Sequence, residues 1–154
     1  MAVVFRPAEE ANIDAMAAIR AREWETEAYW KRRIGAYMAV EQSPQHALPA
    51  RAVFVAMDDG QVVGFVAGHR TRRYGCDGEL EWINVVPERR GHGIAGRLLG
   101  VMAGWFVEQG AFRVCVDVEP KNTAAQGLYA RYGAERLNPH WMVWEDTRKI
   151  GTHP

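Results

Sequence analysis

The chain has 154 residues, 48% of them hydrophobic and 25% charged, a length and composition typical of one domain that can bury a core. Its 19 Lys and Arg residues balance 19 Asp and Glu residues, which excludes binding of nucleic acid or of anionic membranes through bulk electrostatics. We therefore expect a single domain over residues 1–154, with a function that depends on local patterns.

The sequence also predicts the compartment. Its longest uncharged stretches, Gly60–His69 and Leu98–Val107, have ten residues each, against the roughly 20 that a membrane span needs. Acidic residues interrupt the N-terminus where a secretory signal would have its apolar core. Cys76 and Cys115 lie 39 residues apart with no histidine at ligand spacing. We expect a cytoplasmic protein with neither a disulfide nor a metal site.

Hydrophobic periodicity and turn residues predict a mixed order of elements. In chain order these are a strand at Val3–Arg6, a helix at about residues 9–22, a helix at Glu25–Val40, a hairpin of Ala52–Met57 and Gln61–His69, a strand at Glu79–Val86, a helix from Gly91–Gly96 to Gly110, a strand at Phe112–Val118, a helix at Asn122–Tyr132, and a hairpin of Glu135–Leu137 and Trp141–Glu145. Gln42–Ala50, which contains two prolines, is expected to be a loop. The order β-αα-β-β-β-α-β-α-β-β implies an α/β fold with a mixed, mostly antiparallel sheet of about seven strands flanked by about four helices.

The most informative segment joins a strand end to a helix start, and it reads Val85-Val86-Pro87-Glu88-Arg89-Arg90-Gly91-His92-Gly93-Ile94-Ala95-Gly96. A helix N-terminus presents unpaired N–H groups and partial positive charge, and glycines let the backbone approach an anion closely. The segment therefore predicts a cradle for a phosphate or pyrophosphate. Gly100 and Gly104, further along the same helix, indicate close packing as well.

Two known phosphate-binding motifs can be compared with this segment. Gly91-x-Gly93-x-x-Gly96 matches the dinucleotide fingerprint, and Asp117 lies where a ribose-binding acid is expected. However, the motif follows four predicted strands, and the 58 residues after it are too few for a second βαβ half. A kinase-type P-loop would need Gly-Lys-Ser/Thr, which this segment lacks. A dinucleotide-binding oxidoreductase is therefore the weaker alternative.

Two blocks of the sequence match motifs of one known family. They are Arg90-x-x-Gly93-x-Ala95, preceded by Val85-x-Pro87, and Val116-Asp117-Val118-x-x-x-Asn122-x-x-Ala125-x-x-Leu128-Tyr129-x-x-x-Gly133. The first resembles the acetyl-CoA signature of the GNAT superfamily of N-acetyltransferases, and the second resembles a later block of the same family. The order of elements fits along the whole chain, although Ala134 replaces the usual aromatic residue. The resemblance implies a GNAT-like enzyme without a metal, which moves an acetyl group from acetyl-CoA to a primary amine by direct attack. The acceptor would be a small molecule or a peptide.

The resemblance also implies which residues hold the cofactor. The strand before the glycine-rich turn would splay from its neighbour, with Asn84 and Val85 holding the pantetheine arm and the Val85 N–H polarising the thioester carbonyl. The pyrophosphate would meet the backbone amides of Gly91, His92, Gly93, Ile94, Ala95 and Gly96. Arg90 would contribute backbone and charge while its side chain points away from the ligand. Asn122 would bind the cofactor and also cap the following helix.

Acetyl transfer to an amine needs a base, a polarised thioester and an acid for the leaving thiolate. The resemblance implies that Tyr129 is the acid; a tyrosine of the core is the structural alternative. Glu81 stands four residues before Val85, so period-two alternation predicts that it shares the strand face of Val85, and some family members with small amine substrates have a glutamate there. Asp117 matches a base position of the branch that acetylates protein N-termini, and a water chain is the third alternative.

Charge patterning adds an expectation about the acceptor. Three glutamates lie beside tryptophans in the region that covers the acceptor pocket in this family, namely Glu23, Glu25 and Glu27. Three arginines flank the expected phosphate site, namely Arg89, Arg90 and Arg97. This division suits an anionic cofactor and a cationic acceptor, although a solvated helix start is the preferred explanation for most of the glutamates. A homodimer is compatible with the resemblance. A catalytically silent acyl-CoA sensor is the alternative function, and it would need neither acid nor base.

Overall fold

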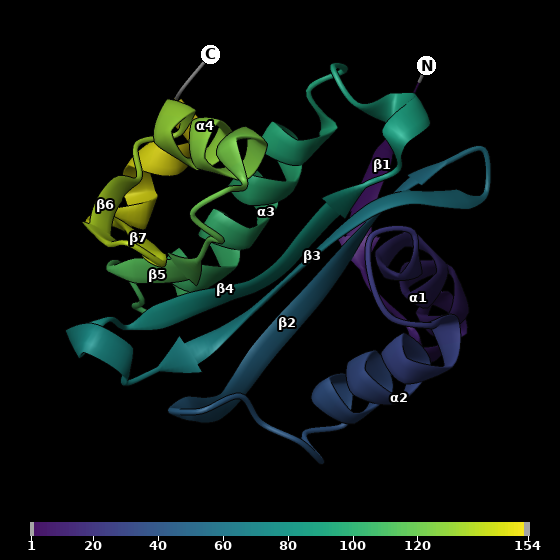
Figure 1. Cartoon of the computed structure of the whole chain (residues 1–154), viewed down its shortest axis with the longest axis horizontal. Coiled ribbons are helices and arrows are strands. Elements are labelled where there is room, and N and C mark those ends of the chain that lie inside the picture. Colours follow the sequence, from purple (N-terminus) through teal and green to yellow (C-terminus); the bar gives the residue numbers. More distant parts are fainter. Residues whose placement is uncertain (1, 153–154) are drawn as a thin grey trace.

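The computed structural model describes residues 2–152 and arranges them around a seven-stranded sheet with the order β1-β2-β3-β4-β5-β7-β6 (Figure 1). Neighbouring strands pair antiparallel except β4 and β5, which pair parallel. The strands are β1 (Val4–Pro7), β2 (Ala47–Asp58), β3 (Gln61–Thr71), β4 (Gly78–Val85), β5 (Val114–Asp117), β6 (Glu135–Asn138) and β7 (Trp141–Trp144). The helices are α1 (Ile13–Ala21), α2 (Glu27–Met38), α3 (Ile94–Glu108) and α4 (Thr123–Arg131). The predicted fold class and element order are confirmed.

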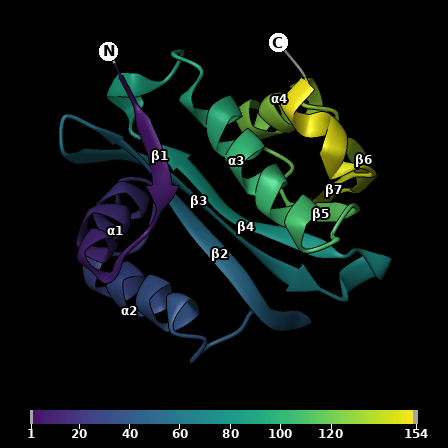
Figure 2. The ribbon, with the colours of Figure 1, turned by 180° about the vertical axis from the view of Figure 1, so that it is seen from behind.

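The sheet separates two apolar layers, as the opposite views in Figures 1 and 2 show. On one face, α1 and α2 pack around Trp30 and Phe65. On the other, α3 and α4 pack around Leu98, Phe106 and Leu80. Burying each such side chain contributes about 1.5–3 kcal/mol, so both layers hold the central strands firmly. Within residues 2–152, every helix is too short or too polar to cross a lipid bilayer.

Helix α2 begins two residues later than predicted. Glu25 has a φ of 62°, a left-handed conformation that a right-handed helix does not contain. The side chain of Thr26 then accepts a hydrogen bond from the Tyr29 N–H at 3.0 Å and caps the first turn. The expected start at Glu25 is therefore wrong, because the backbone reverses direction at that residue before the helix begins.

The loop predicted at Gln42–Ala50 is also too long. Strand β2 already begins at Ala47, which pairs with Thr71 of β3, and the register then shifts before Arg51. Pro49 lies in this irregular stretch, where a residue without an N–H costs no ladder hydrogen bond. The loop prediction fails for its last four residues. The presence of a proline does not reveal whether the neighbouring strand requires an N–H donor at that position.

The two cysteines, distant in sequence, meet in one small cluster with Val143 of β7. Both are buried free thiols, and the Arg113 Nη1 donates to the Cys76 sulfur at 3.4 Å. The hydrogen bond between the thiols lowers the pKa of Cys76 and, together with burial, raises the pKa of Cys115. Sequence separation gave no sign of this contact, which arises because β5 pairs with β4 directly beside the turn that carries Cys76.

Candidate active site

Strands β4 and β5 pair only at their first residues. Gly78–Leu80 lies beside Val114–Val116, whereas β4 continues to Val85 with β3 as its partner. The Val86 N–H donates to the Val63 carbonyl of β3 at 2.9 Å. Because backbone groups alternate sides along a strand, the N–H and C=O of Val85 point the other way, into the gap between β4 and β5. The predicted splay is therefore present, with the Val85 N–H facing it.

Asn84 faces away from this gap. Its carbonyl oxygen would lie 2.9 Å from a Cβ placed on Gly64 of β3, and its side-chain oxygen accepts from the Arg20 Nη1 at 3.0 Å on the α1 side. Because only alternate residues of an edge face the gap, the backbone of Asn84 faces β3. Asn84 still borders the cavity described next, so its place at the cofactor stays a prediction. Ile83, which the sequence analysis did not single out, shares the orientation of Val85 and lines the cavity described next.

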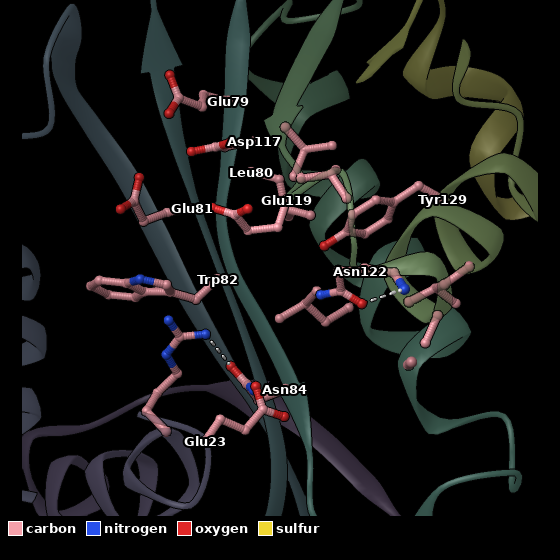
Figure 3. A pocket seen from close by; sticks show the side chains of 18 of the residues that line it. Glu23, Glu79, Leu80, Glu81, Trp82, Asn84, Asp117, Glu119, Asn122 and Tyr129 are labelled. Carbon is pink, nitrogen blue, oxygen red and sulfur yellow. Dashed lines mark hydrogen bonds between the residues drawn. The ribbon is translucent and has the colours of Figure 1, made fainter. Parts of the chain in front are cut away.

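A cavity of about 910 Å³ occupies the gap and continues to α1 and α2 (Figure 3). Its charged lining residues are Arg20, Arg33, Arg73, Arg90, Glu23, Glu79, Glu81, Asp117 and Glu119. Its aromatic lining residues are Trp24, Trp30, Trp82, Trp141 and Tyr129. Cavities that bind small molecules have similar volumes, typically about 300–1,000 Å³. The lining brings residues from both ends of the chain to one site.

The glycine-rich turn has the backbone that an anion cradle needs. Gly91 and Gly93 have φ values of 86° and 79°, and α3 begins immediately after them at Ile94. A Cβ on either glycine would meet open space, so it is their left-handed backbone that requires glycine here. The first turn of a helix leaves its N–H groups without intrahelical partners. His92 is exposed and Ala95 borders the cavity, whereas the Ile94 side chain lies in the core.

Gly96 has a different reason to be glycine. A Cβ at this position would overlap the hydroxyl of Tyr132, which follows α4. By contrast, Cβ atoms on Gly100 and Gly104 would meet nothing within 4 Å. The expectation of close packing at these last two positions is wrong, because they face away from the sheet and from α4. Close approach between α3 and α4 depends on Gly96 alone among these three glycines.

We expect Gly96→Ala to lower the free energy of unfolding by about 1–3 kcal/mol, because the new methyl group displaces the Tyr132 ring. Gly100→Ala, on the same helix, is the matched control and should raise stability by up to about 1 kcal/mol through helix propensity alone. Urea unfolding of both variants measures the difference. Equal effects of the two substitutions would contradict the assignment, and removing the ring by Tyr132→Ala should abolish the penalty of Gly96→Ala.

Arg90 does not keep its side chain apart from the site. Its Nε donates to the Val85 carbonyl at 3.1 Å, and its Nη2 pairs with Glu23 at 3.1 Å. The side chain therefore links the end of β4 to the segment after α1 and borders the cavity. The charge of Arg89 is paired with Asp58, and Arg97 stacks on the ring of Phe5. Two of the three arginines expected at the phosphate site therefore form ion pairs with carboxylates of the chain itself.

Asn122 caps α4, as its position predicted. Its side chain accepts a hydrogen bond from the Ala125 N–H at 3.0 Å. The same residue borders the cavity opposite the end of β4 (Figure 3). Capping leaves the side-chain amide nitrogen of Asn122 available for a ligand, so the two predicted roles are compatible in this geometry.

Tyr129 of α4 directs its hydroxyl into the cavity (Figure 3). The residue is only 6% exposed, and its ring packs edge-on against Trp144 with a centroid distance of 5.4 Å. Burial raises the pKa of Tyr129 well above the usual tyrosine value, although the charge of Arg20 opposes this shift. The phenol is therefore protonated at neutral pH. Tyr132, one turn later, packs against α3 instead, so the two tyrosines serve different surfaces.

Glu81 lies at a β-bulge in β4. Leu80 pairs with Gly68 of β3 and Trp82 pairs with the adjacent Ala67, which leaves Glu81 without a partner residue. The bulge turns Glu81 toward α2, where the Arg33 Nη2 lies 3.8 Å from its carboxylate. The Val85 side chain instead packs in the core below α3. The predicted shared face of Glu81 and Val85 is wrong, since the extra residue breaks period-two alternation between them.

Burial is the main cause of an altered acidity at Glu81. The side chain is only 11% exposed, and desolvation raises the pKa of Glu81 above that of an ordinary glutamate. The charges of His69, Arg33 and Arg20 oppose this shift, whereas the neighbouring Glu79 adds to it. A carboxyl of raised pKa in a cavity is a better proton acceptor than an exposed glutamate.

His69 and Glu79 form a buried polar group below Glu81. The Tyr37 hydroxyl lies 2.9 Å from the His69 Nδ1, and the His69 Nε2 lies 3.7 Å from Glu79. Ligand atoms of His69, Glu79 and Glu81 all fall within 4.8 Å of one another, a proximity that sequence spacing did not reveal. However, the Arg73 Nε donates to the same Glu79 oxygen at 3.1 Å. A guanidinium thus already balances the charge of Glu79.

Asp117 and Glu119 lie where β5 ends, on the wall opposite Glu81 (Figure 3). Asp117 is paired in the sheet with Trp141 of β7, and its carboxyl borders the cavity. Partial burial raises the pKa of Asp117, and nearby His140 opposes the shift. Both sequence candidates for a base therefore share the cavity, but Asp117 is exposed whereas Glu81 is largely buried.

The glutamates between the first two helices do not form one acidic patch. Glu23 borders the cavity but pairs with Arg90, and Glu25 and Glu27 are exposed residues outside the lining. Sequence reasoning missed Arg20 at this end of the cavity. Its only sequence signal was an arginine near aromatic residues, which is common on surfaces.

The chain resembles known proteins in sequence and in fold. The sequence profile described as the Acetyltransferase (GNAT) family matches residues 13–134. Over 90 residues the chain is 33% identical to the aminoglycoside N(6')-acetyltransferase type 1 of Salmonella typhimurium, which covers 54% of this chain and 62% of that protein. An N-acetyltransferase of Mycobacterium tuberculosis is 34% identical over 85 residues, 55% of this chain and 53% of that protein. The chain thus spans little more than half the length of these relatives.

Solved structures share the fold at lower identity. The aminoglycoside 6'-N-acetyltransferase AAC(6')-IG of Acinetobacter haemolyticus has a TM-score of 0.73 at 20% identity, covering 88% of this chain and 92% of that one. The PaiA N-acetyltransferase of Thermoplasma acidophilum, solved with coenzyme A, has a TM-score of 0.72 at 14% identity, covering 95% and 99%. Because the family profile matches most of the chain and the fold agrees, this protein belongs to the GNAT family of acetyltransferases.

Proposed function

We propose that this protein is an acetyl-CoA-dependent N-acetyltransferase that acts on the primary amine of a small molecule or peptide. One observation carries the proposal: a single cavity contains a protonated tyrosine hydroxyl, a buried carboxylate of raised pKa and the gap left by β4 and β5. Family membership supports the reaction class. Neither the acid nor the base would be needed by a domain that only binds acyl-CoA.

The residues around the gap fit acetyl-CoA. This cofactor supplies an acetyl group activated as a thioester. The edge of β4 that faces the gap offers the backbone of Ile83 and the Val85 N–H to an extended pantetheine arm, whereas the Val85 carbonyl already accepts from Arg90. The left-handed glycines at 91 and 93 leave open space at the start of α3 for a pyrophosphate. Asn122 borders the same path.

In the proposed reaction each residue has one task. Glu81 accepts a proton from the acceptor ammonium group, so that the neutral amine can attack. The Val85 N–H donates a hydrogen bond to the acetyl carbonyl oxygen as negative charge develops there. The new C–N bond forms while the C–S bond breaks, and the Tyr129 hydroxyl donates its proton to the departing sulfur. The attacking nitrogen then loses its second proton, which restores the Tyr129 hydroxyl, and Glu81 releases the first proton to solvent. Asp117 is the second candidate base, but burial favours Glu81.

Two measurements test this proposal together. A cofactor that binds only the folded state raises stability by about 2.7 kcal/mol at 100 times its dissociation constant, so CoA should raise the melting temperature. Acetyl-CoA should then release free thiol when primary amines are supplied as a panel of polyamines, amino acids, aminoglycosides and peptides. No change in melting temperature with CoA would refute the binding site. Binding without thiol release from any amine would instead favour a sensor domain.

A further inference from the structure

Arg20 of α1 is held rigidly in the cavity wall. Its guanidinium carbon lies 4.4 Å from the ring centroid of Trp30 and 5.2 Å from that of Trp24. The Nη1 donates to the Asn84 side-chain oxygen at 3.0 Å, a bond drawn in Figure 3. Stacking on the rings and this hydrogen bond fix the orientation of the guanidinium plane. The Arg20 side chain also borders the cavity.

Arg20 differs from the other arginines of the cavity because it has no close ion-pair partner, although Glu23 and Glu81 act on its charge from further away. The remaining cavity arginines each lie within 4 Å of a carboxylate, in the pairs Arg33–Glu81 at 3.8 Å, Arg73–Glu79 at 3.1 Å and Arg90–Glu23 at 3.1 Å. Arg20 has no carboxylate within that distance among residues 2–152, and its Nε is buried without a hydrogen-bond acceptor. Because Arg20 borders the cavity, an anionic group of a ligand bound there would supply the close partner that its charge lacks.

The carboxylates of the cavity divide in the same way. Glu23, Glu79 and Glu81 each have an arginine within 4 Å. Asp117 and Glu119, at the end of β5, have no lysine or arginine that close in the described part of the chain, and both point into the cavity (Figure 3). The cavity thus presents an unpaired cation near α1 and unpaired anions near β5. A polycationic acceptor would match only the second of these.

Resting on the proposed function, we propose that the acceptor is an amine that also carries a carboxylate, as an amino acid does. The carboxylate binds the guanidinium of Arg20, and the amine lies between Glu81, its proposed base, and the carboxylates at the end of β5. Arginine binds carboxylates strongly through its N–H donors, and the Arg20 side chain borders the cavity. The ring of Trp30 beside it is only 4% exposed, and a buried apolar neighbour of this kind strengthens an ion pair.

The test compares acceptors that differ only in the carboxylate. Lysine, lysine amide and cadaverine form one series, and phenylalanine, phenylalanine amide and phenethylamine form another. We expect kcat/KM for each amino acid to exceed that of its amide and its decarboxylated amine by about tenfold or more, since a hydrogen-bonded charge pair has that effect. Arg20→Gln should remove this difference by lowering only the amino-acid values. Arg20→Lys should restore part of it.

Controls separate this inference from folding and from cofactor binding. Arg32→Gln changes an exposed arginine of α2 and should leave every acceptor unchanged. The KM for acetyl-CoA of Arg20→Gln should stay within about twofold of the parent, because Arg20 binds the acceptor rather than the cofactor. Preference for cadaverine, polyamines or aminoglycosides would overturn the inference while leaving the proposed function intact. So would an equal loss for all acceptors in Arg20→Gln.

A binding measurement keeps the inference testable even without turnover. Calorimetric titration of the protein–CoA complex with lysine and with cadaverine should show binding of lysine that Arg20→Gln abolishes. If CoA raises the melting temperature but no amine is acetylated, the proposed function fails, and this titration alone decides whether Arg20 holds a carboxylate. Equal or absent binding of both ligands overturns the inference.

Discussion

Tyr129→Phe is expected to lower kcat by about 10²–10⁴-fold, the usual contribution of a positioned general acid. The substitution removes one oxygen atom and keeps the ring that packs on Trp144. Because burial raises the pKa of Tyr129, its hydroxyl carries a proton over the whole neutral range, as an acid must. Steady-state thiol release with the best amine of the panel measures the effect.

The matched control lies one turn further along the chain. Tyr132→Phe removes a hydroxyl that contacts Gly96 of α3 and does not border the cavity, so kcat should change little. Both variants should show the same rise in melting temperature with CoA as the parent protein. If Tyr129→Phe retained kcat within about threefold of the parent, the hydroxyl would not be the acid, and Tyr129 would be a residue of the core.

Glu81→Gln is expected to lower kcat/KM by about 10²-fold at neutral pH and to change the pH profile. A base acts only when ionised, and burial raises the pKa of Glu81. Activity of the parent protein should therefore fall as the pH drops through this raised value, at a higher pH than for an ordinary glutamate. The variant should lose this step and keep only the ionisation of the amine itself.

Asp117→Asn decides between the two candidate bases. If Asp117 is the base, this substitution abolishes the acidic step of the profile and Glu81→Gln leaves it unchanged. The melting temperature distinguishes the loss of a base from a loss of activity that is caused by unfolding. A carboxyl whose pKa is higher in the folded than in the unfolded state destabilises the fold as pH rises through that interval. The Glu81→Gln variant should accordingly melt no lower than the parent at neutral pH.

Much of the fold could be predicted from local patterns. The order of strands and helices, the hairpin at Asp58–Gly60 and the left-handed glycines before α3 follow from periodicity and turn chemistry, which act over a few residues. Two ordered motifs also placed the chain in its family, and the family profile confirms that placement. The ends of elements were less accurate, as the early start of β2 shows, because pairing with β3 decided them.

The orientation of site residues could not be predicted in this way. Period-two counting placed Glu81 on the face of Val85, but one bulged residue reversed that, and a bulge depends on the register with β3. The resemblance placed Asn84 at the cofactor, but the backbone of Asn84 faces β3. Which residues of a strand offer their backbone to a gap is set by the hydrogen bonds on its other edge.

The charged residues show most clearly which properties follow from sequence and which depend on tertiary structure. The sequence by itself determined that 19 positive and 19 negative residues cancel, and that acids and arginines surround a glycine-rich helix start. Only the tertiary structure decided which of them pair, since Arg90 and Glu23 stand 67 residues apart in the chain but 3.1 Å apart in space. Ion pairing depends on distance in space, and composition and periodicity carry no information about that distance. Among the cavity arginines that the structure describes, Arg20 is the one without a carboxylate within 4 Å.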